Sequence, residues 1–267
     1  MADLEAVKQR QQQAWATGDV SMILTQQILV GELLCEAVDV HPGETVLDVA
    51  TGSGNTALAA ARRGGKVTGV DFVPALLERG RERAAAERLE ITFREGDAEN
   101  IPLPDGSFDI VLSTFGAMFA PNQEKAAREL LRVCRRGGRI GMANWTPDGA
   151  IGEMFGTIAR FVPLPAGLNP PSLWGTEGRL RELFGDGVSS IQVTRRSARI
   201  RHISVERWLE FHRRYLGPTQ KVFEALDASG QEALARALTD LMRRANRSGD
   251  ATLVAPSDYL EVVAVRA

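Results

Sequence analysis

The sequence contains few of the residues that build metal sites, disulfide frameworks or histidine-based catalytic sites. Its 267 residues include three histidines and two cysteines, Cys35 and Cys134, which lie far apart in the chain. Cysteines at short spacing are typical of zinc sites, and several cysteines in a short chain are typical of secreted domains. We therefore expect no bound metal and a reducing compartment.

Long apolar runs and an excess of charge of one sign are also missing. The N-terminal segment is polar and no run of 18 apolar residues occurs, so the sequence predicts neither a secretory signal nor a membrane-spanning helix. A formal net charge of -2 gives no general reason to bind nucleic acid or an anionic membrane. We expect a cytoplasmic protein that is a monomer or a homodimer.

What the sequence does contain is an alternation of strand-like and helix-like segments. Short apolar runs predict strands at 45–50, 66–71, 91–95, 108–113 and 139–145, and helical patterns fill the intervals between most of them. Later strand-like segments lie at 188–203 and 259–266. This order predicts a doubly wound, Rossmann-like α/β fold with a seven-stranded, mostly parallel sheet.

Helical segments outside this alternation predict additional parts of the fold. Residues 1–39 are expected to form an N-terminal helical lid on a core of residues 40–203. Residues 204–250 are expected to form a helical cap insertion, followed by a last strand within 251–267 that returns to the core sheet. Residues 146–178 are rich in proline and glycine and predict a long loop with a short helix.

The turn after the first predicted strand carries two glycines, Gly52 and Gly54. Ligands of open α/β sheets bind at the carboxyl ends of the strands, and glycine allows the backbone to approach a ligand closely. Such turns also occur for purely structural reasons, so the pair alone is weak support for a binding site.

Three acidic residues strengthen this interpretation, because each lies at or near the end of one of the first three strands. Asp48 belongs to the first strand, Asp71 ends the second and Asp97 follows the third. Asp71 lies about 20 residues after the glycine turn, where an acid accepts hydrogen bonds from ribose hydroxyls. Any one of them could be a turn or helix-capping residue, but together they indicate a single ligand crevice.

With these motifs the sequence resembles the class I S-adenosylmethionine-dependent methyltransferases, in the branch of the ubiquinone and menaquinone biosynthesis enzymes. The matching segments are VLDVATGSGN, VTGVDFVPALLERGRERA, FREGDAENIPLPDGSFDIVLS and ELLRVCRRGGRI, which lie within residues 40–146. The family pattern has glycine where this chain has Ala50. The resemblance implies methyl transfer from S-adenosylmethionine to an oxygen, nitrogen or carbon of a small molecule.

The resemblance also assigns residues to the cofactor site. Asp48 would hold the methionine ammonium group, Asp71 the ribose hydroxyls and Asp97 the adenine amino group. The glycine turn would pass the methionine portion with Ala50, Thr51, Gly52, Ser53, Gly54 and Asn55. Phe72 and Ala98 would lie beside the adenine, and Thr114 and Phe115 would face the sulfonium and the acceptor.

Two other classes of function remain open at the level of sequence. The glycine turn also fits the dinucleotide fingerprint, with Ala57 in its third position, so an NAD-dependent oxidoreductase is the runner-up. Asp48 argues against it, because a carboxylate beside the turn repels a pyrophosphate. The third class is a protein that binds S-adenosylmethionine without transferring methyl, since a fold alone does not assign a function.

The acceptor side of the site is less well marked. A hydroxyl acceptor can require a general base, and His202 and His212 in or beside the cap are the candidate catalytic bases, although structural histidines are commoner. The candidate substrate-pocket residues are Met118, Phe119, Trp145 and Tyr215, although core packing explains aromatic residues equally well.

Two further patterns bear on the class of substrate. The segment 169–172, Asn-Pro-Pro-Ser, is similar to the signature of nucleic-acid amino-methyltransferases, but it does not follow the fourth strand, so we interpret it as a stiff loop. Arginines cluster between residues 195 and 214, which is typical of a solvated face. The alternative is a cap surface that attracts an anionic substrate.

Overall fold

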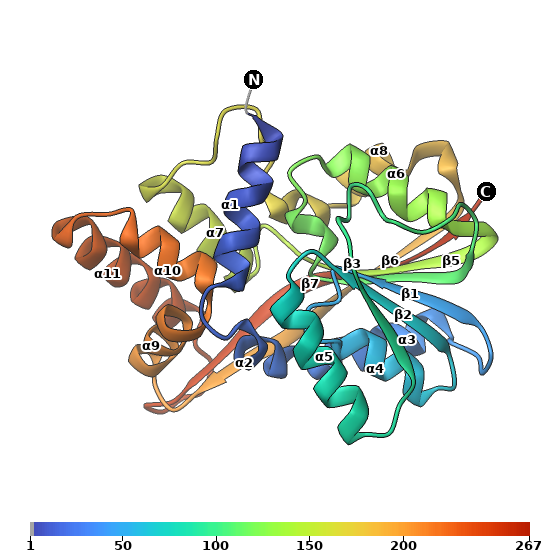
Figure 1. Ribbon diagram of the computed structural model, residues 1–267. Coiled ribbons are helices and arrows are strands. Elements are labelled where there is room, and N and C mark those ends of the chain that lie inside the picture. Colours follow the sequence, from blue (N-terminus) through green and yellow to red (C-terminus); the bar gives the residue numbers. More distant parts are fainter. Residues whose placement is uncertain (1–2) are drawn as a thin grey trace.

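A computed structural model describes residues 3–267 and shows one sheet between two layers of helices (Figure 1). Seven strands of this described part follow the order β3-β2-β1-β4-β5-β7-β6. They are β1 (Thr45–Val49), β2 (Lys66–Asp71), β3 (Ile91–Glu95), β4 (Phe108–Thr114), β5 (Cys134–Trp145), β6 (Val188–His202) and β7 (Leu253–Arg266). Only β7 is antiparallel to its neighbours. The predicted seven-stranded, mostly parallel sheet is confirmed.

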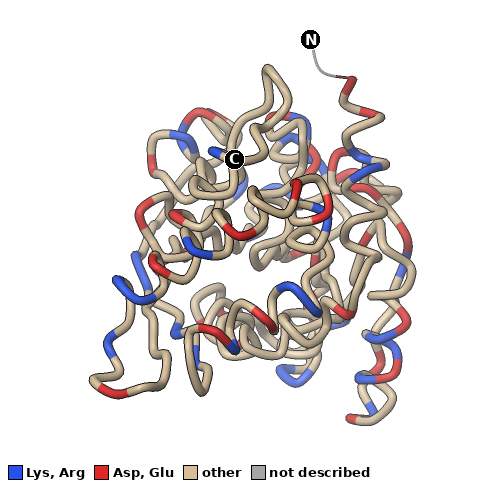
Figure 2. The backbone as a smooth tube through the Cα atoms, turned by 90° about the vertical axis from the view of Figure 1, so that its left-hand side faces the viewer, with Lys and Arg blue, Asp and Glu red and all other residues tan. Residues whose placement is uncertain are grey.

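The helices divide into three groups around the sheet. The group on one face is α3 (Ile28–Val38), α4 (Asn55–Arg62) and α5 (Pro74–Ala86), and the group on the other is α6 (Gln123–Val133) and α8 (Glu177–Phe184) (Figure 1). The third group, at one end of the sheet, is α7 (Ala150–Phe161), α9 (Val205–Tyr215), α10 (Gly217–Glu224) and α11 (Ala228–Ala245), with α1 (Leu4–Ala16) and α2 (Val20–Leu24) between it and the strands. Charges of both signs are interspersed around the fold (Figure 2).

The first strand shows why its sequence is apolar almost throughout. Successive side chains of a strand point to opposite faces of the sheet, and both faces of this sheet are covered. Val46 therefore packs into the cluster beneath α3 and α4, while Leu47 and Val49 pack into the cluster on the other face. β1 and β4 are neighbours in the sheet, and the chain winds outward from them in opposite directions. A crevice forms at the tips of two strands where the winding changes direction in this way.

Residues 146–178 differ from the prediction of a long loop with a short helix, because α7 spans 12 residues. Ile151, Met154, Phe155 and Ile158 follow the i, i+3, i+4, i+7 spacing of an apolar helix face. The glycines and prolines of this region obscured that spacing. Helices α9, α10 and α11 lie between β6 and β7, in the region predicted to be a cap insertion.

The segment Val20–Val38 is long and apolar enough to cross a membrane by length and composition alone. In the structure, however, it is interrupted by a 3-10 turn at Thr25–Gln27. Its α3 portion packs against α4 and β5, and Leu34 and Cys35 are fully buried in the core. The absence of a membrane-spanning helix stays a prediction from the sequence.

The loops that follow β1 and β4 approach each other closely at Gly116. A Cβ atom at this position would lie 2.6 Å from both the Cβ and the carbonyl oxygen of Ala50. Such distances are well inside van der Waals contact, so only glycine lets the two loops meet without displacement. This contact brings the tips of the two central strands together.

We expect Gly116→Ala to lower the free energy of unfolding by roughly 1–3 kcal/mol, because the added methyl group overlaps with Ala50. Urea unfolding followed by circular dichroism measures the change. The matched control is Gly156→Ala in α7, where an added Cβ has no neighbour within 4 Å and a gain of about 0.5–1 kcal/mol is expected. Equal unfolding midpoints for the two variants would contradict this account of the loop contact.

Candidate active site

The carboxylate of Asp71 joins two loops at the tip of β2. Its Oδ2 accepts a hydrogen bond from the backbone N–H of Gly52 at 2.8 Å, and its Oδ1 accepts one from the N–H of Val73 at 2.9 Å. The first bond holds the glycine turn against β2, and the second holds the start of α5. Each oxygen keeps a further lone pair that can accept a hydrogen bond from a ligand hydroxyl group.

Asp48 lies deeper and is 1% exposed. Its Oδ2 accepts hydrogen bonds from the hydroxyl of Thr51 at 2.6 Å and from the N–H of Ala57 at 3.0 Å. Burial raises the pKa of Asp48 to about 7 and that of Asp71 to about 6. Neither carboxylate has an ion-pair partner among residues 3–267, so a cationic group in the cavity would find an uncompensated acid there.

Two residues that line the cavity adopt left-handed backbone conformations, although neither is glycine. Ala50 has a φ of +53° and Phe115 a φ of +57°. This conformation costs a side-chain-bearing residue roughly 1–2 kcal/mol, and such strain is concentrated at binding sites. The positive φ of Ala50 is a conformation that glycine adopts without strain, and here alanine is accommodated in it.

The adenine-side candidate Asp97 is paired with a lysine from the N-terminal helix. Lys8 Nζ lies 2.6 Å from Asp97 Oδ2 and 2.9 Å from Glu99 Oε2. Burial opposes the charge of Lys8, but its hydrogen bonds to the two acids outweigh this effect and raise its pKa. No sequence pattern pointed to Lys8, because its partners lie about 90 residues away along the chain.

Helix α1 also forms hydrogen bonds and an aromatic contact with the loops after β2 and β4. Gln12 Nε2 donates to the carbonyl of Phe72, and Gln11 Nε2 donates to the carbonyl of Phe119 at 3.2 Å. The Trp15 ring meets the Phe119 ring edge-on, with centroids 5.1 Å apart. With the Lys8 ion pairs, one helix therefore spans the loops of three strands.

These elements enclose a cavity of about 380 Å³ at the strand tips. The predicted cofactor residues that line it are Asp48, Ala50, Thr51, Gly52, Asn55, Asp71, Phe72, Asp97, Ala98, Thr114 and Phe115. Phe119 and Trp145 line it as predicted for the substrate pocket, and so does His212. The volume falls in the range of small-molecule sites.

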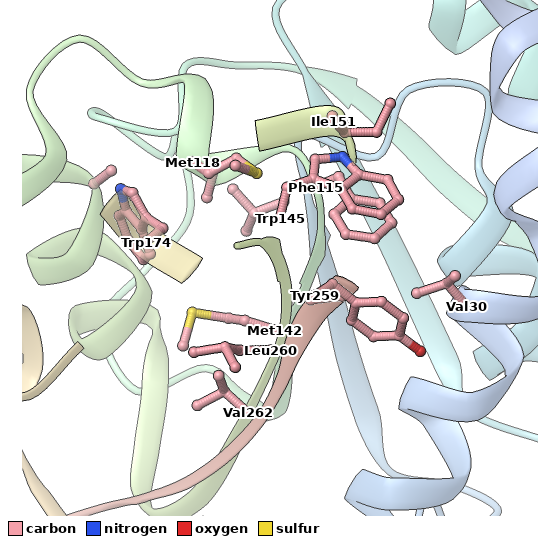
Figure 3. Close-up of a cluster of buried hydrophobic side chains, with 14 of the residues drawn as sticks. Val30, Phe115, Met118, Met142, Trp145, Ile151, Trp174, Tyr259, Leu260 and Val262 are labelled. Carbon is pink, nitrogen blue, oxygen red and sulfur yellow. The ribbon is translucent and has the colours of Figure 1, made fainter. Parts of the chain in front are cut away.

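Five predicted residues lie outside the cavity lining. Ser53 accepts hydrogen bonds from Arg83 at its carbonyl and hydroxyl oxygens, and Gly54 packs on Phe93. Met118 is fully buried in the core cluster drawn in Figure 3 and does not line the cavity, which corrects its assignment to the pocket. The remaining two are the partly buried Tyr215, which ends α9, and His202, which ends β6. His202 Nε2 is 3.2 Å from the side-chain amide of Gln26.

A stacked aromatic pair forms one wall of the cavity. The rings of Phe115 and Trp145 lie face to face, with centroids 3.7 Å apart, and Tyr259 meets both rings edge-on (Figure 3). Phe115 follows β4 and Trp145 ends β5, so two adjacent strand tips build this wall. The flat, rigid surface lies where the cofactor end meets the rest of the cavity.

Helices of the predicted lid and cap, together with α7, supply much of the remaining lining. They contribute Gln11, Ala14 and Trp15 from α1, Val20, Ile23 and Leu24 from α2, Ile151, Met154, Phe155 and Ile158 from α7, and Pro218, Thr219 and Val222 from α10. The apolar spacing in α7 is the one signal that could have found its four residues. The others follow from packing between segments far apart in the chain.

Comparison with known proteins places the chain in a family. Residues 47–142 match the family model described as a methyltransferase domain. An uncharacterized protein of Mycobacterium tuberculosis is 39% identical over 236 residues, 86% of each chain. The demethylmenaquinone methyltransferase of Thermus thermophilus is 41% identical over 128 residues, 46% of this chain and 58% of that protein.

Solved structures share the fold at low sequence identity. YcgJ of Bacillus subtilis aligns with a TM-score of 0.62 and 20% identity, over 88% of this chain and 96% of that one. A geranyl diphosphate methyltransferase, solved in complex with S-adenosylmethionine, aligns with a TM-score of 0.54 and 19% identity, over 90% and 85%. The chain belongs to the class I S-adenosylmethionine-dependent methyltransferases and is an enzyme of that family.

The raised pKa of Asp48 predicts how stability depends on pH. A buried acid whose folded-state pKa is about 7, against 3.8 for the free side chain, favours the folded state fully below pH 3.8 and progressively less up to pH 7. We therefore expect this contribution to the free energy of unfolding of the ligand-free protein to fall over that window. Asp48→Asn removes the titration and should be the more stable protein at pH 8.

Urea unfolding of the wild type and Asp48→Asn between pH 4 and pH 8 measures this difference. The exposed variant Asp186→Asn is the control for loss of one negative charge. A stability gap between Asp48→Asn and the wild type that stays constant across the range would show that Asp48 does not titrate in this window.

Proposed function

We propose that the protein transfers a methyl group from S-adenosylmethionine to a small-molecule acceptor. The observation that carries the proposal is the single cavity that joins three strand-tip acids to a chamber lined by helices. The acids suit the three polar parts of the cofactor, and the chamber beside them offers a mainly apolar lining for an acceptor. The family match supports the same reaction class.

The residues at the strand tips fit this cofactor in charge and in shape. The buried carboxylate of Asp48, unpaired within residues 3–267, suits the methionine ammonium group, and Asp71 keeps lone pairs that could accept hydrogen bonds from ribose hydroxyls. Asp97 lines the cavity on the side of Phe72 and Ala98, where an adenine ring would lie. Gly52 leaves the turn without a side chain on the ligand side.

S-adenosylmethionine, when bound, supplies a methyl group on a positively charged sulfur, which is already activated for displacement. The enzyme then has to hold the acceptor in line and keep water out. Alignment alone is worth roughly 7–11 kcal/mol of the barrier. The stacked Phe115 and Trp145 rings and the covering helices α1, α2 and α7 provide a rigid, mainly apolar enclosure for that purpose.

The geometry argues against the NAD-dependent alternative. In a dinucleotide site the pyrophosphate lies over the glycine turn, at the start of the first helix. Here the buried carboxylate of Asp48 accepts a hydrogen bond from Ala57 N–H, which belongs to the first helical turn. A pyrophosphate would meet this acid at close range, and the two negative charges would repel each other.

Calorimetry with S-adenosylhomocysteine and with NADH separates the two cofactor classes. We expect S-adenosylhomocysteine to bind and NADH not to bind. Asp71→Asn should weaken S-adenosylhomocysteine at least about tenfold, because hydrogen bonds to a charged acceptor are lost. Asp186→Asn should bind like the wild type, and tight NADH binding by the wild type would reverse the assignment.

The N-terminal helix is proposed to act as a lid over the cofactor. It contacts the loops after β2, β3 and β4 through Gln12, Lys8 and Gln11, so the adenine side is covered while these bonds hold. The cap supports α1 from behind, since α10 packs against it. Cofactor exchange then requires α1 to move away from the strand tips.

We expect Lys8→Met to speed the release of S-adenosylhomocysteine several-fold, because the ion pairs that hold α1 to Asp97 and Glu99 are lost. Stopped-flow tryptophan fluorescence can follow release, since Trp15 lies on the same helix. Arg10→Met, at an exposed position of α1, is the matched control and should release at the wild-type rate. Equal release rates for all three proteins would refute the lid.

A further inference from the structure

The half of the cavity away from the strand tips carries no charged side chain within the part of the chain described. The charged residues that line the cavity, Lys8, Asp48, Asp71 and Asp97, all lie at the cofactor end. The helical half is lined mainly by apolar side chains from α1, α2, α7 and α10, and the polar residues among its described lining are Gln11, Gln27, His212 and Thr219. A charged group on a bound acceptor would have no partner there.

His212 is the most defined of these polar residues. His212 is 5% exposed, and its ring Nδ1 lies 3.0 Å from the backbone carbonyl oxygen of Trp208. A carbonyl only accepts hydrogen bonds, so Nδ1 carries the ring proton and Nε2 is left with a lone pair. Within residues 3–267 the His212 ring makes no other hydrogen bond, although the residue lines the cavity.

The surroundings of His212 keep the ring neutral at physiological pH. Burial is the main cause of a pKa lowered to about 4, and the neighbouring His202, whose ring centroid lies 6.2 Å away, lowers it further. Trp208 packs on the same ring at 4.7 Å and Phe211 at 6.3 Å, and neither titrates. A group this reluctant to take a proton is a poor general base, so the structure favours a binding role over the predicted catalytic one.

On the basis of the proposed methyl transfer, we propose that the acceptor is an uncharged, mainly apolar molecule with a hydroxyl group that donates a hydrogen bond to Nε2 of His212. The apolar walls bind the body of the molecule, and the fixed tautomer of His212 selects a donor over an acceptor. His212 is then a specificity-determining residue of the acceptor pocket. The hydroxyl group of the ligand, bonded to Nε2, orients one end of the molecule toward α9.

The apolar walls and the unprotonated Nε2 of His212 disfavour the binding of two kinds of related molecule. A carboxylate or phosphate ester would lose its hydration without gaining a cationic partner, and it would meet the lone pair of Nε2. A molecule of equal shape without the hydroxyl would leave Nε2 unpaired in an enclosed site. Discrimination of this second kind is characteristic of sites built around a substrate hydroxyl.

Three naphthalene probes of similar size test the inference by calorimetry at pH 7, on the full-length protein saturated with S-adenosylhomocysteine. They are 2-naphthol, 2-methoxynaphthalene and 2-naphthoate. We expect 2-naphthol to bind about fivefold or more tightly than 2-methoxynaphthalene, which lacks the donor. We expect 2-naphthoate to bind at least about tenfold more weakly than 2-naphthol.

A matched pair of variants assigns the preference to one residue. His212→Leu should bind 2-naphthol and 2-methoxynaphthalene equally, while His41→Leu, at an exposed turn, should keep the wild-type preference. Both variants should bind S-adenosylhomocysteine like the wild type. If His212→Leu does not fold, the order of the three probes on the wild type decides the matter.

Two outcomes overturn the inference: 2-naphthoate binding as tightly as 2-naphthol, or a preference for 2-naphthol that survives in His212→Leu. Either result, with S-adenosylhomocysteine still bound, leaves the proposed methyl transfer in place and removes only the acceptor class. Failure of the wild type to bind S-adenosylhomocysteine would instead remove the proposed function itself.

Discussion

The hydrogen bonds that Asp71 accepts from two different loops are the constraint on which the site depends. One bond holds the glycine turn after β1, and the other holds the turn that starts α5. Asp48 supports the same turn from the other side, through Thr51 and Ala57. Two carboxylates are thereby buried near each other with no cationic partner in the described part of the chain, a state that favours the binding of a positively charged ligand.

A second constraint is that helices from distant parts of the sequence lie over these acids. Helix α1 comes from the N-terminus, α7 follows β5, and α9 and α10 lie between β6 and β7. Their apolar side chains line the cavity beside the acids and cover part of it. The polar ties from α1 to the loops are few, and such a cover can open without disrupting the sheet.

Most of the cofactor end could be predicted from the sequence because it follows from local rules. Parallel strands bring their carboxyl ends to one edge, so acids at the ends of β1, β2 and β3 had to meet. The prediction was less accurate within the glycine turn, where Ser53 and Gly54 support the turn instead of lining the cavity. Which face of a tight turn a residue shows depends on neighbours such as Arg83 and Phe93, which lie far along the chain.

The sequence by itself determined the alternating strands and helices, the glycine turn and the acids at the strand tips, because periodicity and turn chemistry are encoded over a few residues. Only the tertiary structure decided which residues form the acceptor chamber. It placed Met118 in the core and His202 outside the cavity, and it placed Lys8 on Asp97 and His212 against the carbonyl of Trp208. The physical reason is that enclosure and the state of a buried ring depend on packing between distant segments, for which the sequence has no local pattern.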